Sequence, residues 1–131
     1  RGGLFVGKED VRRALGRADT VIVNALSPEA HRGDAPVNYG RPGHIAGSCN
    51  VFFQTLLAPD GTFLRDDALR APLAAKGLLD APHVIAYCGG GIAATADAFA
   101  LALVGRTEDV AVYDGSLTEW VLDPTAPMET G

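Results

Sequence analysis

The segment HVIAYCGGGIAATADAFALALVG, residues 83–105, decides the fold. Its first five residues, 83–87, are mostly apolar, and such a short run predicts a buried strand. Cys88 and three glycines follow. Residues 93–105 are rich in alanine and end on Gly105, which predicts a helix and its end. A strand, a glycine turn and a helix in succession are typical of a parallel sheet covered by helices.

The same alternation continues on both sides of this segment. Strands are predicted over 20–25, 48–53 and 109–113, and helices over 8–19 and 66–79. We therefore expect an α/β domain with three layers, in which a mostly parallel central sheet of about five strands has helices on both faces.

Turn residues and caps predict the segments between these elements. Ser27 is expected to cap a short helix that Pro28 begins. Residues 33–43 contain two prolines and three glycines and are predicted to form a loop. Residues 59–61 read as a turn, and the tail over 123–131 is predicted to be irregular.

Composition limits the classes of protein to which the chain can belong. At 131 residues, with 47% apolar and 21% charged residues, it fits one globular domain spanning 1–131. A net charge of -5 argues against nucleic acid as a partner. We expect no membrane contact, because no apolar run reaches the roughly 18 residues that cross a bilayer. Because the only methionine is Met128, we expect the chain to be part of a longer protein.

Cysteine and histidine usage points to a reducing compartment. The two cysteines, Cys49 and Cys88, make no disulfide framework, and the three histidines show no metal-ligand spacing. We therefore expect a cytoplasmic protein without a metal site.

Cys88 falls at the carboxyl end of the strand predicted over 83–87, where α/β sheets usually carry function. Glycines permit a close backbone approach, and the following helix adds the positive end of its dipole, so the turn favours a thiolate. The expected cradle consists of the backbone N–H groups of Gly89, Gly90, Gly91, Ile92, Ala93 and Ala94. The alternative is an inert buried thiol. A phosphate-binding loop would need a lysine, and a cysteine phosphatase an arginine, and neither follows Cys88.

Three stretches together resemble the rhodanese (sulfurtransferase) superfamily. They are YCGGGIAA (87–94), GRPGHIAGSCNVFF (40–53) and VYDGSLTEW (112–120), which are similar to the family's active-site loop, its G-H-I-x-G-A-x-N motif and its Y-D-G-S-W-x-E-W motif. The last two most resemble the second, catalytic domain of tandem thiosulfate or 3-mercaptopyruvate sulfurtransferases. The resemblance covers nearly the whole chain and implies a rhodanese-like fold, with a second rhodanese domain as a candidate partner.

The resemblance also implies a reaction and further site residues. Cys88 would take sulfur from thiosulfate or 3-mercaptopyruvate, hold it as a persulfide, and pass it to cyanide or a thiol, with no cofactor. The family's substrate-binding arginines come from the region of Arg32 and Arg41, so these two are the candidates here. Asp114 matches the Asp of Y-D-G-S and is a candidate supporting residue. His44 is expected to fix its loop through a hydrogen bond.

Several positions depart from the family pattern and leave alternatives open. The first strand ends on 24–26, Asn-Ala-Leu, instead of Asp-x-Arg, and Gly89 and Gly90 stand where thiosulfate-type loops carry basic residues. One alternative is therefore a non-catalytic or weakly active binding or regulatory module. Another is a sulfur relay whose donor is a protein persulfide. We expect Tyr113 and Trp120 to belong to the core, and Cys49 to be a buried small residue.

Overall fold

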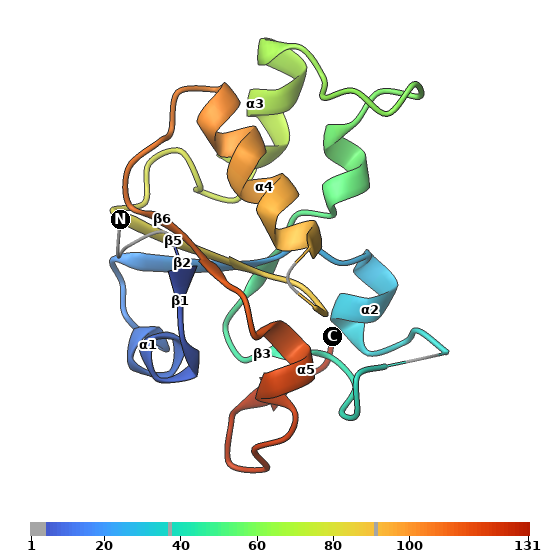
Figure 1. Cartoon of the computed structure of the whole chain (residues 1–131), viewed down its shortest axis with the longest axis vertical. Helices are drawn as coiled ribbons and strands as arrows, with labels where there is room; N and C mark the ends of the chain where they lie inside the picture. Colours follow the sequence, from blue (N-terminus) through green and yellow to red (C-terminus); the bar gives the residue numbers. More distant parts are fainter. Residues whose placement is uncertain (1–4, 37, 91) are drawn as a thin grey trace.

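A five-stranded parallel sheet forms the centre of the molecule (Figure 1). The computed structural model describes residues 5–36, 38–90 and 92–131. The strands lie in the order β1-β6-β5-β2-β4, and all four pairings are parallel. Their bounds are β1 Phe5–Val6, β2 Thr20–Asn24, β4 Cys49–Asn50, β5 His83–Tyr87 and β6 Val110–Tyr113. This arrangement confirms the predicted α/β class.

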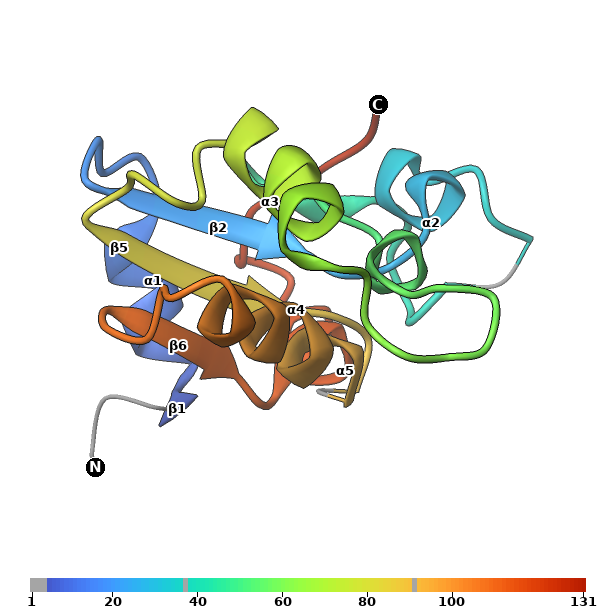
Figure 2. The same cartoon turned by 90° about the horizontal axis from the view of Figure 1, so that it is seen from above.

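Helices cover both faces of the sheet. They are α1 Lys8–Ala14, α2 Pro28–Arg32, α3 Asp66–Ala75, α4 Ile92–Leu103, α5 Ser116–Trp120 and a 3₁₀ helix, η1, Phe53–Leu56. In Figures 1 and 2, α3 and α4 lie over one face, α1 and α5 lie on the other, and α2 lies beyond the carboxyl ends of the strands. No helix in the described part of the chain is long and apolar enough to cross a membrane.

The central strand β5 contributes side chains to both halves of the core. Val84 and Ala86 belong to the apolar cluster on the α3 and α4 side, whereas Ile85 and Tyr87 belong to the cluster on the α1 and α5 side. Successive side chains of a strand point to opposite faces. Cys88 continues this alternation and joins the cluster on the α4 side, so the sheet itself directs the thiol towards that helix.

Local backbone geometry ends two of the predicted helices. The helix predicted over 8–19 ends at Ala14, and Gly16 then takes a φ of +76°, which a helix cannot continue. The helix predicted within 66–79, with its close near Lys76 and Gly77, covers Asp66–Ala75, and Gly77 likewise has a φ of +76°, which confirms the predicted close. Both glycines sit where a left-handed residue is common at a helix end.

The strand predicted over 48–53 was largely wrong. Only Cys49 and Asn50 pair with β2, and the chain turns into η1 at Phe53. The apolar run of this segment reflects burial: Val51 is buried in the α3 and α4 cluster, and Phe53 packs against it. A short apolar run indicates burial more reliably than it distinguishes a strand from a 3₁₀ turn.

The prediction of an irregular tail over 123–131 was also wrong in part. Strand β7, Met128–Glu129, pairs antiparallel with β3, His44–Ile45. Gly43 makes this approach possible: it has a φ of +101°, and any side chain there would run into the Glu129 carbonyl. The pairing holds the carboxyl terminus beside the G-H-I stretch.

Candidate functional site

Cys88 lies directly after β5, at the carboxyl edge of the sheet, and only 2% of it is exposed. Its backbone is bonded to the start of α5, because the carbonyls of Cys88 and Gly89 accept hydrogen bonds from the N–H groups of Leu117 and Thr118, each at 3.0 Å. The sequence places these two segments 28 residues apart, and the parallel pairing of β5 with β6 brings them together. The thiol is therefore held by a rigid frame.

Ser116 contributes a polar side chain that contacts Cys88. Its Oγ accepts a hydrogen bond from the Cys88 N–H at 3.0 Å, donates to the Tyr113 carbonyl at 2.8 Å and lies 4.0 Å from the Cys88 Sγ. Ser116 is fully buried and has a φ of +50°, a conformation that costs free energy in any residue other than glycine. This strained serine has one hydroxyl proton, which can point to the carbonyl or to the sulfur.

The predicted cradle of N–H groups is described in part. Gly91 lies outside the described residues. Within the described residues, no hydrogen bond is found for the N–H groups of Gly89 and Gly90. An α-helix presents N–H groups at its N-terminal end, and α4 begins at Ile92. Gly89, Gly90 and Ala93 line the same cavity as Cys88. The arrangement can stabilise a negative sulfur there.

The cavity at Cys88 measures about 320 Å³. Apart from Cys88 and the two glycines, its walls are Leu26, Tyr39, Phe53, Ala93 and Ala96. The ring of Tyr39 lies against Gly89, and a side chain at position 89 would require this exposed ring to move. Among the described residues, no Asp, Glu, Lys, Arg or His lines the cavity.

Neither candidate arginine lines this cavity. The guanidinium of Arg41 donates to the carbonyls of Asp123 and Ala126, at 3.0 and 2.9 Å, and so ties the 40–43 loop to the segment before β7. Arg32 forms an exposed ion pair with Asp34 at 3.1 Å. Both side chains thus have partners away from the sulfur.

Asp114 follows β6 and is exposed, and it is not among the residues that line the Cys88 cavity. Tyr113 and Trp120 are fully buried, which confirms that they belong to the core. Cys49 is only partly buried, whereas a buried position was expected. Burial still raises the pKa of the Cys49 thiol to about 11, so this second thiol stays protonated at neutral pH.

A polar network supports the loops that reach the site. The His44 Nδ1 lies 2.7 Å from the His31 carbonyl, which confirms the hydrogen bond predicted for His44, and the two imidazole rings stack at 3.7 Å. Asn24, which stands where the family carries Asp, lies 3.1 Å from the His31 Nδ1. Burial, with the nearby His44, lowers the pKa of His31 to about 4. His31 is therefore neutral at pH 7.

Asp97 has no place in the sequence predictions. It lies on α4, is fully buried, and neither carboxyl oxygen has a hydrogen-bond partner. Burial raises the pKa of Asp97 to about 8. A buried acid without a hydrogen-bond partner lowers the stability of the fold. Asp97 lies among small apolar residues in the sequence, and that pattern gave no sign of a buried acid.

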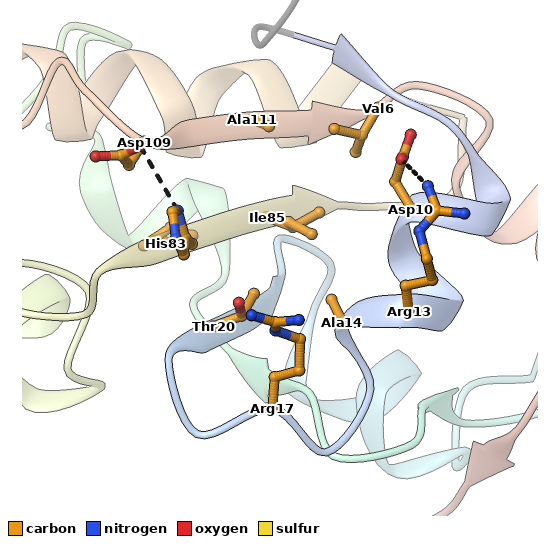
Figure 3. Close-up of a pocket in the computed structure, with 11 residues that line it drawn as sticks. Val6, Asp10, Arg13, Ala14, Arg17, Thr20, His83, Ile85, Asp109 and Ala111 are labelled. Carbon is orange, nitrogen blue, oxygen red and sulfur yellow. Dashed lines mark hydrogen bonds and ion pairs between the residues drawn. The ribbon is translucent and has the colours of Figure 1, made fainter.

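A second cavity, of about 410 Å³, lies at the opposite end of the sheet (Figure 3). Thr20 and His83, the first residues of β2 and β5, line it, whereas Cys88 follows the last residue of β5. Its charged rim residues pair with acids: His83 with Asp109, and two arginines of the α1 region with acids of their own. This cavity contains no cysteine.

The structure adds three site residues that sequence reasoning missed, namely Tyr39, Phe53 and Ser116. Ser116 and Phe53 carried a signal, because they belong to the VYDGSLTEW and GRPGHIAGSCNVFF stretches. In the described ranges, no group of three or more His, Cys, Asp or Glu side chains is arranged to hold a metal ion.

Comparison with protein families gives one match that spans most of the chain. The model of the rhodanese-like domain matches residues 8–123. The "Putative thiosulfate sulfurtransferase SseB" of Mycobacterium tuberculosis is 39% identical over 116 residues, covering 88% of this chain and 40% of the relative. The "Probable 3-mercaptopyruvate sulfurtransferase" of Pseudomonas aeruginosa is 32% identical, covering 98% of this chain and 45% of the relative. The chain spans less than half the length of these curated relatives.

Solved structures agree with this match. The anaerobic ergothioneine biosynthesis enzyme from Chlorobium limicola, in complex with trimethyl histidine, superposes with a TM-score of 0.89 and 26% identity, covering all of this chain and 33% of the enzyme. A variant of EanB in complex with ergothioneine superposes with a TM-score of 0.90 and 26% identity, again covering all of this chain and 33% of the other. Another EanB structure, 25% identical with a TM-score of 0.89, covers the same shares and carries a cysteine persulfide.

Proposed function

This chain belongs to the rhodanese-like domain family, and from that premise we propose that it is a sulfurtransferase in which Cys88 carries the transferred sulfur as a persulfide. One observation carries the proposal. Cys88 is the cysteine that combines the carboxyl end of a central parallel strand, the N-terminus of a long helix and an adjoining cavity. The sulfurtransferase names of the relatives support the same reaction class.

The reaction proceeds in two displacements. The Cys88 thiolate attacks the outer sulfur of a donor such as thiosulfate; a sulfur–sulfur bond forms, and the donor's own bond to that sulfur breaks, so that sulfite leaves with the electron pair. With 3-mercaptopyruvate as the donor, the carbon–sulfur bond breaks, the carbon takes up a proton, and pyruvate leaves. A thiophilic acceptor, cyanide or a thiol, then attacks the outer sulfur, and the Cys88 thiolate is the leaving group. In both steps the negative charge lies on a sulfur atom at the Cys88 position.

The surroundings of Cys88 suit this charge. Backbone N–H groups of Gly89 and Gly90 and the first turn of α4 supply fixed dipoles that need no reorganisation when the sulfur becomes an anion. Low exposure of Cys88 keeps water from the persulfide. We assign the cradle role to these main-chain groups.

The proposal predicts a measurable covalent intermediate. Incubation of the chain with thiosulfate, 3-mercaptopyruvate or inorganic polysulfide is expected to add the mass of one sulfur atom, and subsequent cyanide is expected to remove it and release thiocyanate. Intact-protein mass spectrometry and a thiocyanate assay measure the two steps. If no donor adds sulfur, the enzyme proposal fails; sulfur gained only from a protein persulfide would instead favour the relay.

Ser116 offers a test of the frame around the sulfur. Ser116→Gly relieves the positive φ but removes the hydroxyl that bonds the Cys88 N–H, whereas Ser116→Ala removes the hydroxyl and keeps the strain. We expect both variants to lose sulfur transfer to a similar extent, about tenfold to a hundredfold, as for one buried hydrogen bond. Thermal unfolding should show the glycine variant as the more stable one. Transfer rates that instead follow stability would contradict a role for the hydroxyl.

A further inference from the structure

The Cys88 cavity has apolar walls, and these walls restrict which molecules can exchange sulfur with Cys88. Its side-chain walls come from four separate parts of the chain: Leu26 after β2, Tyr39 in the 33–43 loop, Phe53 in η1, and Ala93 and Ala96 on α4. Two of these walls are aromatic rings. A volume of about 320 Å³ is enough for a small organic molecule, and apolar walls of this kind recognise apolar bodies.

Among the described residues, no charged side chain lines the cavity, and the start of α4 lies at its sulfur end. The N-terminal end of α4 and the turn N–H groups favour an anion at Cys88 itself. The nearby loop arginines are directed elsewhere, since Arg41 donates to two backbone carbonyls and Arg32 pairs with Asp34. A carboxylate on the far end of a bound thiol would therefore lose water without gaining a charged partner.

The apolar surface continues outward along α4. Phe99 lies one helical turn beyond Ala96, is 54% exposed, and packs against Phe63 with ring centroids 5.3 Å apart. A ligand body longer than the cavity would thus meet an aromatic surface rather than a charged one.

We propose that the thiol that takes sulfur from Cys88 has an uncharged, apolar body, of which an aryl or alkyl group is the chemical type. This inference rests on the proposed function. The acceptor thiol loses its proton to solvent, and its sulfur forms a bond with the outer sulfur of the Cys88 persulfide. The bond from that outer sulfur to Sγ breaks, Cys88 leaves as a thiolate, and the product is the hydropersulfide of the acceptor. The sulfur donor would contact the same cavity walls. The acceptor is the better molecule to vary, because different thiols react with the persulfide in the same way.

Two thiols that differ by one para carboxylate group test this inference. The full chain is loaded with excess inorganic polysulfide and freed of it, and the sulfur on Cys88 is then followed by intact mass after addition of benzyl mercaptan or of 4-(mercaptomethyl)benzoate. We expect benzyl mercaptan to remove the sulfur at least about tenfold faster, because the carboxylate has no partner in the cavity.

A charge introduced into the wall should largely cancel this preference. Ala96→Lys places an ammonium at the half-buried edge of the cavity, where the carboxylate of the second thiol would lie, and we expect it to speed removal by that thiol about tenfold. Ala102→Lys adds the same charge to an exposed position of α4 that does not line the cavity, and it should keep the wild-type preference.

The outcomes separate this inference from the proposed function. Sulfur on Cys88 that both thiols remove equally fast, or that only the carboxylated thiol removes, overturns the inference and leaves the sulfurtransferase proposal standing. A chain that acquires no sulfur from polysulfide or any other donor overturns the sulfurtransferase proposal, and the inference falls with it.

Discussion

Replacing Cys88 with alanine is expected to abolish sulfur transfer, with a loss of about a thousandfold or more, as expected when the nucleophile of a covalent mechanism is removed. The variant should gain no sulfur from thiosulfate, 3-mercaptopyruvate or polysulfide, and intact mass measures this directly. The fold should survive, because alanine fits the space that the buried thiol leaves, and the Cys88 backbone bonds to Ser116 and Leu117 remain. A thermal unfolding curve checks that condition.

Cys49 provides the matched control. It is the chain's other cysteine and lies on β4, which pairs with β2. Its side chain packs on the same side of the sheet as that of Cys88 and is more exposed. Its thiol has a pKa raised to about 11 and stays protonated, so exposure alone does not make it a nucleophile. Cys49→Ala should therefore gain sulfur as the wild type does. Loss of sulfur uptake in this variant, or retention of it in Cys88→Ala, would contradict the assignment of the persulfide to Cys88.

The contrast between the two cysteines shows what the sequence can predict about the site. Cys88 was identifiable because a long strand, a glycine turn and a long helix are each visible locally, and the carboxyl-edge rule then selects the residue between them. β5 covers His83–Tyr87 as predicted, and α4 begins within one residue of its predicted start. Elements of this kind bury enough side chains to be defined by their own pattern.

The shorter elements could not be predicted because their own residues do not define them. β1, β3, β4 and β7 have two residues each, and each exists because a neighbouring segment is held beside it. The pairing of β3 with β7 depends on Gly43 and on segments more than 80 residues apart in the sequence. A two-residue strand has no periodicity to detect.

The cavity walls were missed for a related reason. Tyr39 lies in a glycine- and proline-rich loop, and only the tertiary structure places its ring against Gly89. For the arginines, the sequence gives the charge and the region but not the direction of the side chain. Arg41 is directed to carbonyls of the segment before β7, a contact that requires the tail to be folded back.

Replacing Asp97 with asparagine is expected to stabilise the fold, and more so as the pH rises. Asp97 is the group concerned because it is fully buried without a hydrogen-bond partner, and its pKa is about 8 instead of 3.8. The folded state therefore binds a proton that the unfolded state has released at every pH between these two values. Stability falls as pH rises through this window, by up to about 1.4 kcal/mol per pH unit, and levels off above pH 8.

The expected cost of Asp97 is large for a domain of this size. Between pH 3.8 and pH 7 it amounts to roughly 4 kcal/mol, against a typical total stability of about 5–15 kcal/mol. His31 opposes this trend over part of the range. Its pKa is lowered to about 4, so the unfolded state binds more protons and stability rises with pH up to about 6.5. The pH profile of the wild type alone therefore does not isolate Asp97.

The difference between two variants does isolate it. Asparagine has nearly the shape of the protonated acid but no proton to lose, so the stability of Asp97→Asn relative to the wild type should grow steadily from pH 5 to pH 8. Urea unfolding at several pH values measures this difference. Asp80→Asn, which removes a carboxyl from an exposed position, is the matched control and should show no such growth. A difference for Asp97→Asn that is constant with pH would mean that the buried carboxyl is ionised in the folded state and has a partner.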